Sequence, residues 1–204
     1  MRFTAVAMSA VALAALACAD STTPPTTPAA APFASKLAGA SADRSADDAH
    51  TLRIYDSCDP ATFNAVFNDP TICIKQGHVP FDRFIAELTQ TQQAAQWRFG
   101  PKNVELNAGE NVFALNVGGE VHTFTPVVAY GGSLIPDINA LIGAGDAPVE
   151  CQGLEPDDFV ASGTQYRIEA EELANVADAN GIAKIQCCIH PWMRAEVHLH
   201  GAVN

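Results

Sequence analysis

The chain has 204 residues, of which 48 % are hydrophobic and 17 % charged, a balance sufficient for one core of moderate size. Its formal net charge is −12 and it has no basic cluster, which argues against nucleic acid as a partner because phosphate contacts come from lysine and arginine. No apolar run reaches the roughly 20 residues that a membrane-spanning helix needs.

The first residues have the pattern of an export signal. Residues 1–17 begin with a positive charge at Arg2 and continue with a short apolar run, as a secretory signal peptide does. The run ends in Ala-Leu-Ala-Cys and resembles a bacterial lipobox, in which Cys18 is lipidated. Cleavage without lipidation, with release of a soluble protein, is the alternative. We expect an exported protein, periplasmic or at the cell surface, with membrane attachment only through Cys18.

Residues 18–50 are rich in alanine, serine, threonine and proline and contain almost no large apolar side chain. Such a segment cannot bury enough surface to offset the entropy of ordering it. We therefore expect a disordered linker. Export also implies an oxidising compartment, in which disulfides persist.

Helical spacing appears in residues 51–96, for which we expect a small helical segment. Its clearest stripe follows the i, i+3, i+4, i+7 pattern, with Phe81, Phe84, Ile85 and Leu88. Pro80 suits the first turn of this helix, and a shorter helix is expected over 61–67.

Cys58 and Cys73 bracket part of this segment, and we expect them to form a disulfide. The bridge would close a 15-residue loop and stabilise the fold by about 3 kcal/mol on the chain-entropy estimate.

From Trp97 onward the pattern changes to short strands separated by glycine, proline and asparagine. We expect strands at 104–106, 112–117, 122–130, 165–169, 183–188 and 194–200. One or two helical turns are expected over 171–177, and 131–162 shows little periodicity. The pattern is typical of an all-β sandwich or barrel, here a domain of residues 97–204.

The chemistry of the chain is concentrated after one strand near the C-terminus. Cys187, His190 and Met193 follow one another at three-residue spacing. A thiolate, an imidazole and a thioether are the ligand set suited to copper that cycles between two oxidation states. His122, which follows a Gly-Gly turn at the start of a strand, can supply the second imidazole, because two loops can meet at one end of a sandwich.

This loop resembles the type 1 (blue) copper loop of the cupredoxin family, in the plastocyanin and amicyanin-like branch. The His-Thr-Phe sequence after the glycine turn resembles the family's first histidine ligand. The resemblance implies a Greek-key β-sandwich, cupredoxin-like, and one copper ion used for electron transfer. It implies His122, Cys187 and His190 as equatorial ligands and Met193 as the weak axial one.

Cys187 and Cys188 compete for the thiolate role. Cys187 has the family's gap to His190, and neighbouring strand residues point to opposite faces, so we expect Cys188 to face away. The cysteines then left over pair as Cys58 with Cys73 and as Cys151 with Cys188, or the second pair stays as two free thiols. Backbone amides near Thr123 are expected to donate to the ligand sulfur.

We expect an electron-transfer protein and not an enzyme, because related copper enzymes need further histidine-rich centres and the chain has only 6 His. His198 and His200 share one strand face, where a solvated surface is favoured over half of a second metal site. The alternative function is a non-catalytic copper-handling or metal-binding module. A redox partner protein such as a cytochrome or an oxidase is expected to dock where the edge of His190 reaches the surface, steered by the acidic charge.

Overall fold

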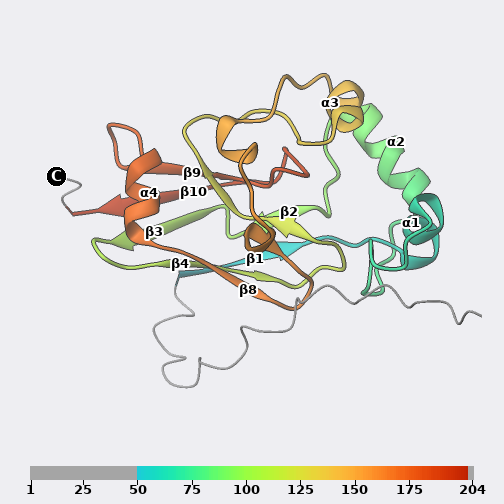
Figure 1. Ribbon diagram of the computed structural model, residues 1–204, viewed down its shortest axis with the longest axis horizontal. Helices are drawn as coiled ribbons and strands as arrows, with labels where there is room; N and C mark the ends of the chain where they lie inside the picture. Colours follow the sequence, from blue (N-terminus) through green and yellow to red (C-terminus); the bar gives the residue numbers. More distant parts are fainter. Residues whose placement is uncertain (1–49, 202–204) are drawn as a thin grey trace, which may run out of the picture. The chain divides into compact units, whose positions relative to one another are not determined.

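Two four-stranded sheets form the scaffold of residues 50–201, the part of the chain that the computed structural model describes (Figure 1). The first sheet has the order β2–β1–β4–β8, with β1 Thr51–Tyr55, β2 Arg98–Gly100, β4 Val112–Asn116 and β8 Gln165–Ile168. The second has the order β3–β10–β9–β6, with β3 Asn103–Asn107, β6 Thr125–Val127, β9 Ile182–Gln186 and β10 Arg194–His200. A short ladder joins β5, His122–Thr123, to β7, Phe159–Val160.

The two sheets share one hydrophobic core. In β3, for example, Val104 and Leu106 are buried whereas the residues between and beside them are exposed. Side chains at alternate positions point to opposite faces of a sheet, so the apolar face of each sheet turns toward the other. The strands expected from the sequence between 104 and 200 are confirmed in position, except that the strand expected over 122–130 is divided into β5 and β6, which belong to different sheets and end at Val127. The short helix expected after β8 is confirmed as α4, Ala170–Val176.

Residues 51–55 correct the expected domain boundary. We expected them in the helical segment outside the sandwich, but they form β1, which pairs in parallel with β4 and antiparallel with β2. Leu52 and Ile54 are fully buried between the sheets. A five-residue strand carries too little periodicity to be recognised alone, and its partner β4 lies far along the sequence.

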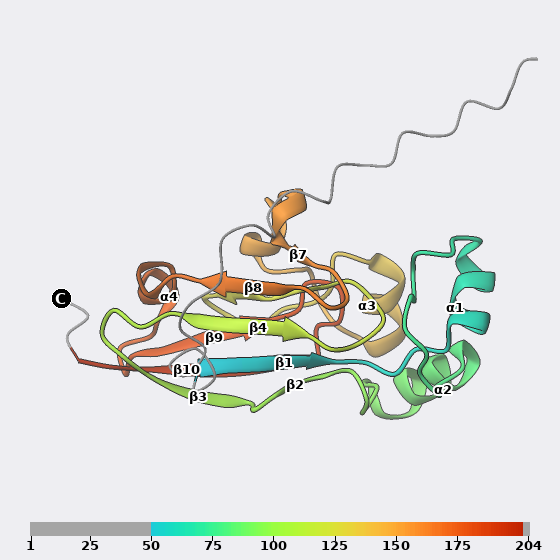
Figure 2. The same ribbon diagram turned by 90° about the horizontal axis from the view of Figure 1, so that it is seen from below.

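Two helices lie at one end of the sandwich (Figures 1 and 2). They are α1, Pro60–Phe67, and α2, Phe81–Thr91, and both confirm the helices expected from the sequence. Asp59 caps α1 by accepting the Thr62 amide, and Pro80 immediately precedes α2. Phe63, Phe84 and Leu88 are buried, so the apolar faces of both helices belong to the same core as the sheets.

The segment between β6 and β8 contains elements that the sequence did not predict. They are α3, Pro136–Ile142, the short 3-10 turns Val149–Cys151 and Pro156–Asp158, and β7. No helix within residues 50–201 is long and apolar enough to cross a bilayer. The expected signal peptide over 1–17, the linker over 18–50 except for its last residue, and the lipidation of Cys18 lie outside the described residues.

Candidate metal centre

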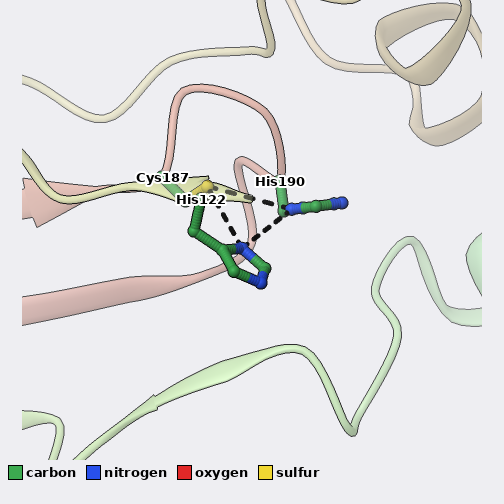
Figure 3. Close-up of side chains that lie close together, drawn as sticks. All are labelled: His122, Cys187 and His190. Carbon is green, nitrogen blue, oxygen red and sulfur yellow. Dashed lines mark hydrogen bonds between the residues drawn. The ribbon is translucent and has the colours of Figure 1, made fainter. Parts of the chain in front are cut away.

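Three side chains from two distant parts of the chain converge at one end of the sandwich (Figure 3). His122 Nδ1 and His190 Nδ1 are 3.2 Å apart, and each lies 3.8 Å from Cys187 Sγ. His122 and Cys187 are fully buried and His190 is 4 % exposed. Each residue therefore turns one donor atom toward a common, water-poor point.

The loop after β9 holds two of these donors in a tight turn. The Met193 amide donates to the His190 carbonyl at 2.9 Å, and the Cys187 amide donates to the Met193 carbonyl at 3.1 Å. These bonds close the loop between β9 and β10, which pair in antiparallel fashion. Met193 is buried and its backbone is fixed in the ligand loop. Its role as an axial ligand stays a prediction.

His122 reaches the loop because β5 runs beside it. The Thr123 amide lies 3.5 Å from Cys187 Sγ and donates to it, as the sequence predicted. The Thr123 hydroxyl accepts the Cys188 amide at 2.7 Å. The strand that supplies the first imidazole is thus joined directly to the residues that supply the thiol.

Cys188 points away from the donor atoms. Its sulfur is bonded to Cys151, and both residues lie with Val127 in a small separate apolar cluster. Cys58 and Cys73, which flank α1 in the sequence, form a second disulfide. Among the described residues, Cys187 is the cysteine that carries no disulfide, which leaves its sulfur available for a metal.

The electrostatics of the three donors favour a preformed thiolate. Burial opposes ionisation of Cys187, but hydrogen bonds from His122 and His190 bring the pKa of its thiol well below its usual value. Burial likewise opposes the charged form of His122, yet hydrogen bonds to Asp56 and Cys187 raise its pKa to about 10. Both shifts favour a thiolate–imidazolium pair when no metal is bound, and a cation that takes both donors displaces the imidazole proton.

Asp56, which the sequence analysis did not identify, binds the other side of the His122 ring. Its Oδ2 lies 2.9 Å from His122 Nε2, and its side chain is only 1 % exposed. Burial raises the pKa of this carboxyl, but the hydrogen bond from His122 and the amides of Gly119 and Glu120 hold it below its usual value. No local pattern indicates this contact, because Asp56 lies 66 positions before His122 in a stretch typical of a turn.

Glu120 lies beside the second imidazole. Its Oε2 is 3.8 Å from His190 Nε2 and accepts a hydrogen bond from the indole of Trp97. Burial raises the pKa of Glu120, whose carboxylate has far fewer donors than that of Asp56. A second group of possible ligands, Asp56, Cys58 and Glu120, also comes close together, but Cys58 is bonded to Cys73 and cannot act as a thiolate ligand.

The outer edge of His190 is covered. The ring of Phe84 in α2 meets the His190 ring edge-on at 6.3 Å between centroids, and Trp192 lies at 5.4 Å. Trp97 packs against this group at a tilt, with its ring centroid 4.6 Å from that of Phe84. The expectation that His190 reaches the surface is wrong, because the helical segment packs its aromatic face over the ligand loop.

His198 and His200 lie apart from the centre, on the outward side of β10. His200 Nε2 is 2.5 Å from Glu105 Oε2, and His198 Nδ1 is 3.8 Å from the other oxygen of the same carboxylate. Both imidazoles are partly or largely exposed. The structure therefore places them on a solvated strand face and does not bring them to the three buried donors.

The spacing of the three donor atoms fits a single transition-metal ion. Bonds to imidazole nitrogen and thiolate sulfur are about 2.0–2.3 Å long, so two such donors on one ion lie about 3–4 Å apart. The separations among His122, Cys187 and His190, 3.2 and 3.8 Å, fall in this range. Two imidazoles and a thiolate are the ligands of a trigonal copper site, although zinc also accepts these donor types.

No protein-family model and no curated protein matches this sequence. A purple cupredoxin from Nitrosopumilus maritimus is similar in structure, with TM-score 0.34 and 17 % identity over 52 % of this chain and 86 % of that one. Amicyanin from Paracoccus versutus gives TM-score 0.30 and 18 % identity over 53 % and 77 %. A mutant plastocyanin of fern gives 0.32 and 12 % over 74 % and 99 %. These structural neighbours of the chain are cupredoxins.

Proposed function

We propose that this chain is a copper-binding electron-transfer protein with one mononuclear type 1 site on a Greek-key sandwich of the cupredoxin type. His122, Cys187 and His190 are the equatorial ligands and Met193 is the axial ligand. The observation that carries the proposal is the convergence of one free thiol and two imidazoles, all buried, with their donor atoms 3.2–3.8 Å apart.

Copper bound at these donors supplies a one-electron couple. The chain's own contribution is rigidity, because both ligand segments belong to paired strands and the loop between β9 and β10 is closed by backbone hydrogen bonds. Donors that stay in place in both oxidation states keep the rearrangement on electron transfer small. The Thr123 amide withdraws charge from the sulfur, and Phe84 and Trp192 exclude water from His190.

The proposal also includes the protein's cellular location and its redox partner. We infer an exported protein, periplasmic or at the cell surface, attached to a membrane through lipidated Cys18. Its function is to exchange electrons with a redox partner such as a cytochrome or an oxidase, without catalysis of its own. The net charge of −12 favours a basic docking surface on that partner.

The experiment is to add cupric ion to the purified protein and record its visible and electron paramagnetic resonance spectra. We expect an intense thiolate-to-copper charge-transfer band that Cys187→Ser abolishes. His198→Ala, which removes an imidazole from the outer face of β10, serves as the matched control and retains the band. A Cys187→Ser protein that keeps the band would refute the ligand assignment.

The covered His190 favours a second candidate, a non-catalytic module that holds or hands over copper. In this case the cover protects a stored ion, whereas a carrier needs rapid exchange. The two are separated by stopped-flow oxidation and reduction with a small one-electron reagent and with a redox protein. Fast turnover with both supports the carrier, and turnover with neither supports the metal-holding module.

A further inference from the structure

The structure surrounds Asp56 with hydrogen-bond donors. Gly119 donates its amide to Oδ1 at 2.8 Å, Glu120 donates its amide to Oδ2 at 3.0 Å, and His122 Nε2 lies 2.9 Å from Oδ2. An ionised carboxylate only accepts hydrogen bonds, so the imidazole nitrogen facing it carries the proton. When His122 holds a metal, the other ring nitrogen, Nδ1, therefore supplies the lone pair, and it is the atom turned toward Cys187.

The glycine turn before His122 is shaped around this carboxylate. A Cβ atom built on Gly118 would lie 1.9 Å from Asp56 Oδ2, and one built on Gly119 would lie 2.8 Å from the sulfur of Cys58. No side chain fits at either position without a shift of its neighbours. The same carboxylate thus fixes the backbone of the turn and the ring at the end of it.

We propose that Asp56 is a positioning residue for the metal centre, which sets the tautomer and orientation of His122 and lowers the reduction potential of the site. This inference rests on the proposed copper site. A negative charge buried behind one ligand stabilises the oxidised ion, which carries one more positive charge, more than it stabilises the reduced ion. Partners of this kind behind a metal-bound histidine typically change metal affinity by about 10–100-fold.

The first test compares wild type with Asp56→Asn, an isosteric change that removes the charge. We expect Cu(II) affinity to fall about tenfold more than Cu(I) affinity, which corresponds to a rise in potential of about 59 mV for a one-electron couple. Asp137→Asn removes the same charge from an exposed position and is the matched control. Asp56→Glu, which keeps a carboxylate, is expected to restore part of the difference.

The second test needs no variant. Wild-type protein loaded with Zn²⁺ is diamagnetic, and the hydrogen bond predicts a slowly exchanging Nε2 proton on His122 in its nitrogen-edited NMR spectrum. This signal would support the role of Asp56 even if Asp56→Asn does not fold.

Either of two results would overturn the inference. One is a potential in Asp56→Asn equal to that in Asp137→Asn, and the other is a His122 ring protonated at Nδ1 in the zinc-loaded protein. Failure of the proposed function would look different, because wild-type protein itself would then develop no thiolate-to-copper band.

Discussion

The two sides of the metal centre are built in different ways. On one side, Cys187 and His190 lie three residues apart in a loop between two paired strands. On the other side, Asp56 and Glu120 face the outer nitrogens of the two imidazoles, and the aromatic rings of the helical segment lie over His190. Cys187 and His190 are therefore local in sequence, whereas His122 and the groups that cover the two imidazoles come from segments far apart.

This difference indicates that the two sides have different roles in the proposed site. In the proposed site, the ligand side determines which metal ion is held, because donor types and spacing decide the coordination. The cover side determines the dielectric and the charge around that ion, because it brings buried carboxylates and aromatic rings against the ligands. The helical segment between β1 and β2 thus forms part of the surroundings of the proposed metal centre, through the contact of Phe84 with His190.

The largest effect on stability and on access to the metal is expected from removing an aromatic ring that covers His190. Phe84→Ala removes a buried ring that contacts His190, Trp97 and Trp192. We expect a loss of about 3–5 kcal/mol in the free energy of unfolding, and access of added azide or imidazole to the loaded copper. Denaturant titration and the visible spectrum measure the two effects.

Phe67→Ala is the control for this experiment, because Phe67 belongs to the same segment but is 53 % exposed. Its expected cost is about 1 kcal/mol, with no change in access to the metal. Equal behaviour of the two variants would show that the cover does not shield the site.

The two disulfides test the same comparison between the ligand side and the side that covers it, with a somewhat smaller expected loss in the free energy of unfolding. Replacing Cys58 and Cys73 by alanine opens a 15-residue loop beneath the cover, with an expected loss of about 3 kcal/mol. The copper band should remain, because Cys187 is not involved.

Replacing Cys151 and Cys188 opens a 37-residue loop beside the ligand strand. In addition to its loss of stability, this variant is expected to show a broadened or shifted copper band. Denaturant titration with and without copper checks both, and loss of the band in the first variant would contradict the separation of the two sides.

The pH dependence of the metal-free protein tests the ion pair between the ligands. The pKa of His122 is raised from 6.5 to about 10, so its contribution to stability is complete below pH 6.5 and is lost as the pH rises through about 10. The pKa of Cys187 is lowered well below 9.0, so its contribution is complete above pH 9.0 and is lost as the pH falls through the folded value. We expect the thermal midpoint to be highest between about pH 6.5 and 9 and to fall on both sides.

Thermal unfolding followed by circular dichroism measures this profile. In Cys187→Ser the contribution of the thiolate is absent, so the decrease on the acid side should become shallower than in wild type. Superimposable profiles for the two proteins would show that no thiolate–imidazolium pair forms without metal.

The smallest effect on stability is expected from the hydrogen bond between Tyr130 and β10. The Tyr130 hydroxyl donates to the Ala195 carbonyl at 2.9 Å, and Arg194 lies over the ring. Tyr130→Phe keeps the ring and should cost about 1 kcal/mol with an unchanged copper spectrum. Urea titration and the visible spectrum check this result, and a shifted band would mean that this hydroxyl influences the site through β10.

Local patterns were enough to predict most of the strands between 103 and 200, with β7 the exception, and the helices α1 and α2. The alternation of apolar and polar residues in strands and the i, i+3, i+4, i+7 stripe of a helix are patterns of neighbouring residues, so they are visible in the sequence. β1, β2, α3 and β7 were missed because each is short and depends on partners elsewhere in the chain. The surface position expected for His190 failed for the same reason, since nothing near it in sequence indicates that Phe84 lies over it.

The sequence by itself determined the donor types and their spacing in the loop from Cys187 to Met193, because a turn between two paired strands carries its own ligands. Only the tertiary structure decided that Asp56 meets His122 and that α2 closes over His190. Those contacts join residues more than 60 positions apart, and the packing of the whole core, which no short pattern encodes, brings them together.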